Sequence, residues 1–146
     1  MMKITVNLQN ESGITKLPLK KDFKAWIAAA ILQNRAAEIA IRLVSESESA
    51  ALNAQFRGKN YATNVLSFPY ECDESRVWGD LAICPTVVIR EAAEQGKTLF
   101  AHFAHLTIHG TLHLQGFDHE SESEALEMET LEIQILEKLG IANPYE

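Results

Sequence analysis

The sequence predicts an α+β fold in a single domain, residues 1–146, with a mixed four-stranded sheet packed against about five helices. A length of 146 residues is enough for one hydrophobic core without a disulfide or a metal to hold it. Strand-like and helix-like hydrophobic patterns alternate through the first part of the chain, and helical patterns dominate from residue 86 onward. All five histidines fall within residues 102–119, on an expected central helix and the turn that follows it.

A helix is expected between the first two strands of the chain. Apolar and polar residues alternate over residues 4–8 and again over residues 39–43, which predicts two strands that are each buried on one face. Between them, apolar residues recur at helical spacing, and Asp22 is a suitable N-cap. We therefore expect a first helix from Asp22 to about Ala37.

A second helix is expected over residues 46–56. Ser45 followed by Glu48 has the pattern of a capping box, in which each side chain bonds to the other residue's backbone N–H. Gly58 suits the left-handed residue that commonly ends a helix. The second strand therefore leads directly into a second helix.

Two more strands are expected over residues 63–68 and 81–84, each rich in β-formers and followed by a proline. The polar residues 70–79 between them are expected to form a loop. Because no helix separates these two strands, they should pair in antiparallel fashion. Helical crossovers earlier in the chain favour parallel pairing, so a mixed sheet is predicted.

Three helices account for most of the remaining chain. A short helix over residues 86–95 should end at Gly96, and a longer one over residues 98–115 is apolar nearly all round, as expected of a buried central helix. Ser121 and Glu124 form a second capping box that begins the last helix. Its apolar stripe is Met128, Leu131, Ile135 and Leu139, and its many glutamates are expected on the solvated face.

The strongest chemical signal is the segment H-G-T-L-H-L-Q-G-F-D-H, residues 109–119. His109 and His113 are four residues apart and share one face of a helix. Gly116 can end the helix in a left-handed conformation, so that the chain turns back and brings His119 to the same point. Three imidazoles with a fourth position open to water are typical of catalytic zinc. We therefore predict one zinc ion, or another divalent transition metal, at His109, His113 and His119.

The neighbouring polar residues allow more than one interpretation. His102 and His105 share the side of the helix that carries His109, either as hydrogen-bonded core histidines or as groups that extend the site toward a substrate. Asp118 could act as a base, orient an imidazole or cap the turn. The spacing also matches the metzincin peptidases, but their glutamate base is replaced here by Gly110, which weakens a peptidase assignment.

The charge distribution is uneven. The net charge is −7, and residues 120–146 hold eight acidic residues against one lysine, so the remainder is neutral. A broad electrostatic nucleic-acid surface is therefore not expected unless basic residues cluster in space, although RNA is not excluded. The sequence shows no apolar run long enough to span a membrane and no secretory signal, which predicts a cytoplasmic protein without a membrane partner.

Two segments together resemble the YbeY family of bacterial endoribonucleases. One is the histidine motif, residues 109–119, and the other is R-G-K-N-Y-A-T-N-V-L-S-F-P, residues 57–69. The resemblance extends over almost the whole chain. Family members commonly have tyrosine before the Asp-His pair, where this chain has Phe117; the change removes a hydroxyl but leaves the expected ligands intact.

The resemblance implies a metal-dependent, single-strand-specific endoribonuclease that acts in 16S rRNA 3′-end maturation and ribosome quality control. It also implies zinc at the three histidines, with catalytic roles for Arg57 and His109. An arginine suits this chemistry because a guanidinium binds a phosphate in bidentate fashion and keeps its charge at neutral pH. The implied partners are an rRNA precursor, the small ribosomal subunit and its assembly factors, and no nucleotide cofactor is expected.

Substrate contacts are expected from Arg57, Lys59, Ser67, His105 and Asp118. Two other functions stay open from the sequence alone. One is a metzincin-like metallopeptidase without its usual glutamate. The other is a non-catalytic ribosome-assembly factor whose metal is structural, which the three-ligand count argues against.

Overall fold

The computed structural model describes residues 3–70, 72–118 and 120–146. Four strands form one sheet: β1 (Ile4–Asn10), β2 (Ala36–Leu43), β3 (Val65–Pro69) and β4 (Arg76–Ile83). Five helices accompany it: α1 (Lys20–Ala30), α2 (Glu46–Arg57), α3 (Pro85–Gln95), α4 (Leu99–Leu114) and α5 (Glu122–Lys138). The predicted single-domain α+β architecture is confirmed.

The sheet is mixed, with the spatial order β1-β2-β4-β3. β2 pairs in parallel with both β1 and β4, whereas β3 and β4 are antiparallel, with Val65 opposite Ile83. This is the pairing predicted from the helical crossovers and from the direct connection between β3 and β4. The short edge strand β3 and the neighbouring β4 contact α4, so the sheet places β3 beside the histidine helix.

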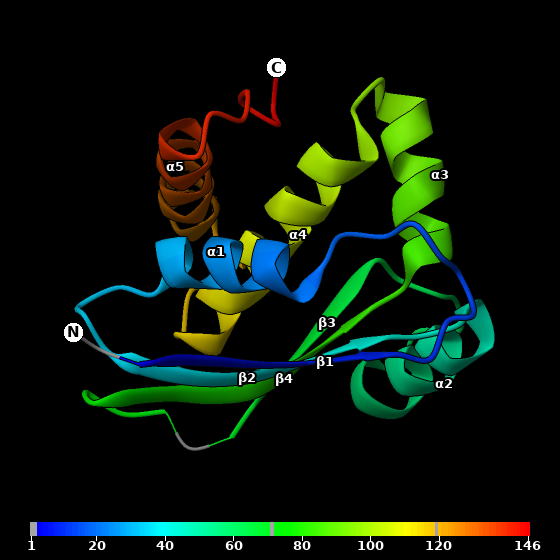
Figure 1. Ribbon diagram of the computed structural model, residues 1–146, viewed down its shortest axis with the longest axis horizontal. Helices are drawn as coiled ribbons and strands as arrows, with labels where there is room; N and C mark the ends of the chain where they lie inside the picture. The colour runs from blue at the N-terminus through cyan, green and yellow to red at the C-terminus, as the bar shows by residue number, and fades with distance from the viewer. Residues whose placement is uncertain (1–2, 71, 119) are drawn as a thin grey trace.

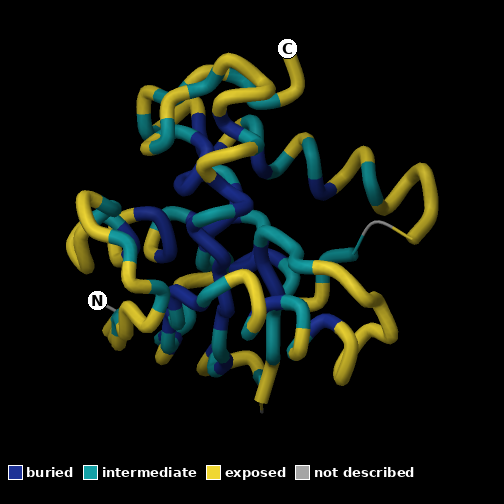
Figure 2. Tube along the Cα trace, turned by 90° about the vertical axis from the view of Figure 1, so that its right-hand side faces the viewer, coloured by how far each residue is buried: buried dark blue, intermediate teal, exposed yellow. Residues whose placement is uncertain are grey.

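Helices α1 and α4 pack on one face of the sheet, and α5 packs against α4 on the side away from the strands (Figure 1). α2 lies apart from this layer, at the end of the sheet (Figure 1). Buried chain segments gather in the interior between these layers (Figure 2). As expected, α4 is the central buried helix. Among the described residues, no helix has both the length and the apolar character needed to cross a bilayer.

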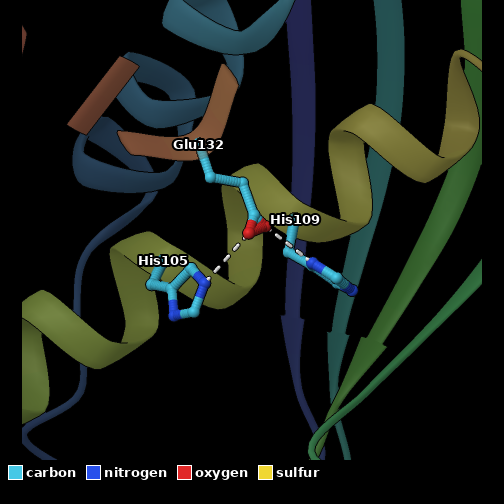
Figure 3. Close-up of side chains that lie close together, drawn as sticks. All are labelled: His105, His109 and Glu132. Carbon is cyan, nitrogen blue, oxygen red and sulfur yellow. Dashed lines mark hydrogen bonds and ion pairs between the residues drawn. The ribbon is translucent and has the colours of Figure 1, made fainter. Parts of the chain in front are cut away.

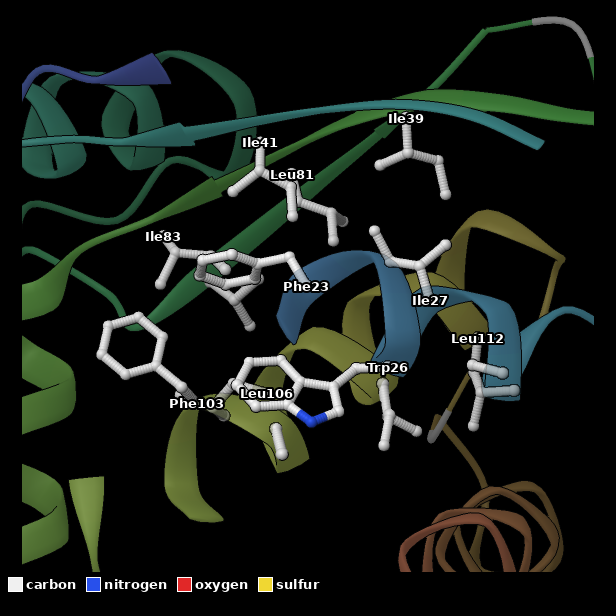
Figure 4. Packing of buried hydrophobic residues seen from close by; sticks show 14 of the residues in the cluster. Phe23, Trp26, Ile27, Ile39, Ile41, Leu81, Ile83, Phe103, Leu106 and Leu112 are labelled. Carbon is white, nitrogen blue, oxygen red and sulfur yellow. The ribbon is translucent and has the colours of Figure 1, made fainter. Parts of the chain in front are cut away.

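The core forms between α1, α4 and the inner face of the sheet (Figure 4). Phe23 is fully buried and meets Trp26 and Phe103 edge to face, with ring centroids 5.4 Å and 6.0 Å away. Ile41 and Leu81, on the neighbouring strands β2 and β4, are also fully buried. This packing fixes α4 on the sheet and therefore fixes the position of its histidines.

Two predicted boundaries of α1 are wrong. The helix begins at Lys20 with Leu19 as N-cap, and Asp22 lies inside the first turn, where its carboxylate accepts a hydrogen bond of 2.8 Å from the backbone N–H of Leu19. It ends at Ala30 instead of about Ala37, because Gln33 and Asn34 have left-handed φ values of 64° and 53°. The chain then has room to start β2 at residue 36.

The loop predicted over residues 70–79 is also wrong in part. Residues 76–79 belong to β4, which pairs with β2 from Ala36 opposite Arg76 onward. Trp78 is only partly buried on this strand, and two side chains pack against its ring. The Tyr70 ring meets it edge to face, with the centroids 5.0 Å apart, and the Arg76 guanidinium lies 4.6 Å from the centroid of the Trp78 ring. The polar character of the segment therefore reflects a partly solvated strand.

Candidate active site

Helix α4 presents His109 and His113 one turn apart. Their Nε2 atoms are 3.1 Å from each other, so both rings point toward a common position. The helix ends at Leu114, and Gly116 has a φ of 98°, the left-handed conformation expected for the turn. His119, the third predicted ligand, lies outside the described residues.

Glu132, a residue of α5, lies between two histidines of α4, His105 and His109 (Figure 3). Glu132 is completely buried, and its Oε2 accepts a 2.8 Å hydrogen bond from His109 Nδ1. Its Oε1 lies 3.3 Å from His105 Nε2 and also accepts a hydrogen bond from the Tyr145 hydroxyl. The expectation that the α5 glutamates lie on the solvated face is therefore wrong for Glu132, whose negative charge is stabilised by three neighbouring donors.

The electrostatics of this cluster favour an ionised Glu132. Burial alone would raise its pKa, but hydrogen bonds from His105 and His109, the charge of His109 and the Tyr145 hydroxyl outweigh burial and lower the pKa to about 2. Burial and the hydrogen bond to Glu132 raise the pKa of Tyr145, which therefore keeps its proton. The hydrogen bond to this ionised carboxylate keeps a proton on His109 Nδ1, and the other ring nitrogen, Nε2, faces His113.

Two sets of ligand atoms in this cluster are compatible with a metal ion. His105, His109 and Glu132 each offer one ligand atom, and these atoms lie within 4.8 Å of one another. A metal placed among them would have to displace hydrogen bonds that Glu132 already accepts. On the other side of His109, the Nε2 separation of 3.1 Å is close to the ~3.3 Å expected between two imidazole ligands of a tetrahedral zinc.

The donor chemistry therefore fits a metal held by the Nε2 atoms of His109 and His113. With a metal bound there, Glu132 would orient the His109 ring and make its Nε2 a stronger electron donor. Tyr145 and His105 in turn fix the Glu132 carboxylate. The carboxylate-histidine pair is the usual support of a metal-binding imidazole.

The two histidines line an open cleft of about 1060 Å³. The cleft is bounded by the end of α2, by β3 and by the turn after α4, and it brings together Arg57, Ser67, Asp118, His109 and His113. Among the described residues, Lys59 and His105 do not line the cleft. Lys59 is exposed and follows Arg57 closely in the sequence, whereas His105 faces Glu132. Five of the eight predicted site residues thus share one cavity; the other three are Lys59 and His105, which do not line it, and His119, which is outside the described residues.

Arg57 is placed by the end of α2. It is the last residue of that helix, and Gly58 follows as a left-handed cap with a φ of 69°. Its side chain is exposed at the cleft wall. The guanidinium therefore enters the cleft from a different helix than the two histidines that line it.

Ser67 has a structural contact that the sequence did not indicate. Its hydroxyl donates a 3.2 Å hydrogen bond to the backbone carbonyl of Gly110, which ties β3 to α4 directly beside His109. Ser67 still lines the cleft, so its position is set by this bond.

Gly110 is where α4 comes closest to the sheet. A Cβ at this position would lie 2.8 Å from Leu81 Cδ2 and 3.3 Å from both Ser67 Oγ and Val65 Cγ2. Leu81 is fully buried and cannot move aside without disturbing the core. The position that carries the glutamate base in metzincin peptidases therefore faces the sheet in this fold and has no room for a side chain.

Gly110→Glu is accordingly expected to destabilise the protein strongly. Overpacking of a filled core costs about 1–3 kcal/mol, and burial of an unpaired carboxylate adds to this. Thermal unfolding of the purified variant measures the effect. Ala54→Glu is a suitable control, because it adds the same side chain at an exposed position of helix α2, where little change is expected. A Gly110→Glu protein as stable as the wild type would contradict the close approach of α4 and β4.

Glu132 and Tyr145 are the functional candidates that sequence reasoning missed. A signal was present for Glu132: it is four residues after Met128 and three before Ile135, so it lies on the buried stripe of α5. A charged residue on the buried face of a helix needs a partner, and the histidines of α4 provide it. No comparable local pattern marks Tyr145.

The fold and the cleft together define an α+β protein with a histidine-rich, metal-compatible centre beside an exposed arginine. Residues 5–140 match the family described as Endoribonuclease YbeY. Two relatives with the same description are similar over nearly their full length: one from Colwellia psychrerythraea, 52% identical over 99% of this chain and 98% of the relative, and one from Nitrosococcus oceani, 51% identical over 99% of both. The chain therefore belongs to the YbeY endoribonuclease family.

The fold comparison agrees with this assignment. The solution structure of the Thermotoga maritima protein TM1509 superposes with a TM-score of 0.61 at 26% sequence identity, and the alignment covers 93% of this chain and 92% of the other. The similarity thus includes the sheet and the helices that bound the cleft.

Proposed function

We propose that this protein is a zinc-dependent endoribonuclease that cleaves single-stranded RNA in its histidine-arginine cleft. The observation that carries the proposal is the convergence, in one cavity, of two imidazoles suited to a metal and a guanidinium suited to a phosphate. Family membership supports RNA as the substrate, because the relatives are described as endoribonucleases.

The residues have distinct roles in this proposal. His109, His113 and His119 hold one zinc ion, or another divalent transition metal, and Glu132 orients His109. When bound, such an ion activates a water molecule and polarises a phosphoryl oxygen. Arg57 binds the scissile phosphate and stabilises the charge that develops on it during cleavage. Asp118, at the cleft wall, is a candidate to accept a proton from the attacking group.

The attacking group is either water or the 2′-hydroxyl of the RNA. The two give different products, because attack by the 2′-hydroxyl leaves a 2′,3′-cyclic phosphate and attack by water leaves none. Mass spectrometry of the cleaved ends distinguishes them. Both reactions use the same phosphate contact at Arg57, so the assignment of the cleft is independent of this outcome.

The biological substrate we propose is the 3′ end of a 16S rRNA precursor, with ribosome quality control as the wider role. The small ribosomal subunit and its assembly factors would then be the partners, in the cytoplasm, and no nucleotide cofactor is required. The support for this part is the resemblance of the two motifs, residues 57–69 and 109–119, to the family.

The two alternative functions are not favoured. A metallopeptidase would need a base at Gly110, where the sheet leaves no space for one. An assembly factor with a purely structural metal would not need an exposed arginine at an open cleft beside the ligands. The test is a matched comparison of the wild type, Arg57→Ala and His113→Ala for metal content and for cleavage of an rRNA-precursor fragment, with a peptide library as the substrate control.

A further inference from the structure

Three aromatic rings line the same cleft as the histidines. Phe56 and Tyr70 are 56% and 49% exposed, and Phe68, a residue of strand β3, is half-buried. By contrast, core rings such as Phe23 and Phe103 are completely buried. Single exposed aromatic residues are common on protein surfaces, but a group that lines a functional cleft indicates a ligand with flat apolar faces.

These rings are held in place by their neighbours. Phe56 and Phe68 meet edge to face with centroids 5.0 Å apart and an interplanar angle of 71°. The Tyr70 ring meets Trp78 edge to face at 5.0 Å, and its hydroxyl donates a hydrogen bond to Asp80. An edge-to-face contact fixes the orientation of a ring and leaves a face of it available for stacking.

The wall that carries Phe56 is also rigid. Two buried side chains of α2 tie this helix to the segment that leads into β3. The Ser49 hydroxyl both donates to the Thr63 carbonyl and accepts from the Thr63 N–H, at 2.9 Å each, and Asn53 Nδ2 donates to the Tyr61 carbonyl at 2.8 Å. Phe56 is therefore presented by a preorganised surface, which lowers the entropy cost of binding.

Phe56 directly precedes Arg57, the proposed phosphate ligand, and both line the cleft. We propose that Phe56, supported by Phe68, is a stacking subsite for a nucleobase of single-stranded RNA next to the phosphate bound by Arg57. Tyr70 offers a second ring on the same cleft wall. This inference rests on the proposed function, because it requires RNA to enter the cleft.

The chemistry of stacking explains two properties of such a site. Every nucleobase has a flat π-face, so a phenyl ring that offers no hydrogen bond accepts bases with little sequence preference. In a duplex both faces of a base are covered by its neighbours, and the base must leave the helix before it can stack on Phe56. The subsite therefore favours single-stranded RNA without reading its sequence.

The test is binding of short fluorescent 2′-O-methyl oligoadenylates by anisotropy, compared with oligomers of the same length whose bases are removed. Phe56→Leu is expected to weaken binding of the oligoadenylate about tenfold, which corresponds to about 1.4 kcal/mol. It should leave binding of the abasic oligomer unchanged, because Arg57 and the phosphates are intact. Phe56→Tyr keeps an aromatic ring and should therefore bind the oligoadenylate as tightly as the wild type.

Phe100→Leu is the matched control. Phe100 is 49% exposed on α4 and packs on Trp26, and it does not line the cleft in the described part of the chain. Its substitution should change neither affinity. Equal affinity of Phe56→Leu and wild type for the oligoadenylate would overturn the stacking subsite, and so would an equal loss for the abasic oligomer.

The outcome also separates this inference from the proposed function. If the wild type cleaves and binds RNA but Phe56→Leu is unchanged, the stacking subsite fails and the endoribonuclease assignment stands. If the wild type neither binds these oligomers nor cleaves RNA, both proposals fail.

Discussion

Glu132→Gln is expected to weaken zinc binding by about 10- to 100-fold, because a carboxylate that orients a metal-binding histidine contributes about that much to affinity. The substitution keeps the shape of the side chain but removes the charge that stabilises His109 and His105. It also leaves an amide with a single acceptor oxygen where the buried carboxylate accepted three hydrogen bonds, so the free energy of unfolding should fall by about 1–3 kcal/mol. Competition with a chromogenic chelator measures the affinity, and denaturant titration of the metal-free protein measures the stability.

Glu137→Gln is the matched control for this experiment. Glu137 lies on the same helix α5 and is exposed, so the substitution changes the net charge equally without touching the histidines. It should leave both quantities unchanged. If Glu132→Gln bound zinc as tightly as the wild type, Glu132 would not position His109.

Arg57→Ala is expected to reduce RNA cleavage by at least about 100-fold, as is typical when one preorganised donor to the developing charge is removed. Metal content and thermal stability should stay at the wild-type level, because the side chain is exposed at the end of α2 and is not part of the hydrophobic core. Initial rates on a single-stranded RNA and metal analysis of the same preparation measure both.

Two further variants make this result specific. Arg57→Lys keeps the charge but loses the bidentate fork, and its rate should lie between those of the wild type and Arg57→Ala. Arg90→Ala removes an exposed arginine of α3 that pairs weakly with Glu46, at 3.8 Å, and should cleave normally. Wild-type cleavage by Arg57→Ala would exclude this residue from the reaction.

The order and type of the elements were predictable from the sequence because they depend on local patterns. Apolar residues alternate along β1 and β2, which indicates strands buried on one face. Helix α4 is apolar nearly all round, which indicates a buried helix. The ends of elements were less predictable. β4 begins at Arg76 because β2 is there to pair with it, and such a long-range partner leaves no local signal.

The candidate site likewise contains residues that local patterns predict and residues that they do not. The placement of His109 and His113 on one face of α4 follows from helical spacing, which is local, and their Nε2 atoms lie 3.1 Å apart. That both bind one metal ion stays a prediction. Glu132 belongs to a distant helix, and its charge suggested a surface position although its spacing placed it on the buried stripe. Arg57 was found through family resemblance, since an arginine at the end of a helix is ordinarily a solvated residue.

The most direct test of the central claim is a comparison of His113→Ala with the wild type, purified in parallel, for bound metal and for cleavage of a single-stranded RNA. The cleft is proposed to act through a metal held at His109 and His113, whose Nε2 atoms face each other. We predict that His113→Ala loses both the metal and the cleavage while keeping its fold. A metal-free His113→Ala protein that cleaves RNA at the wild-type rate would contradict this account.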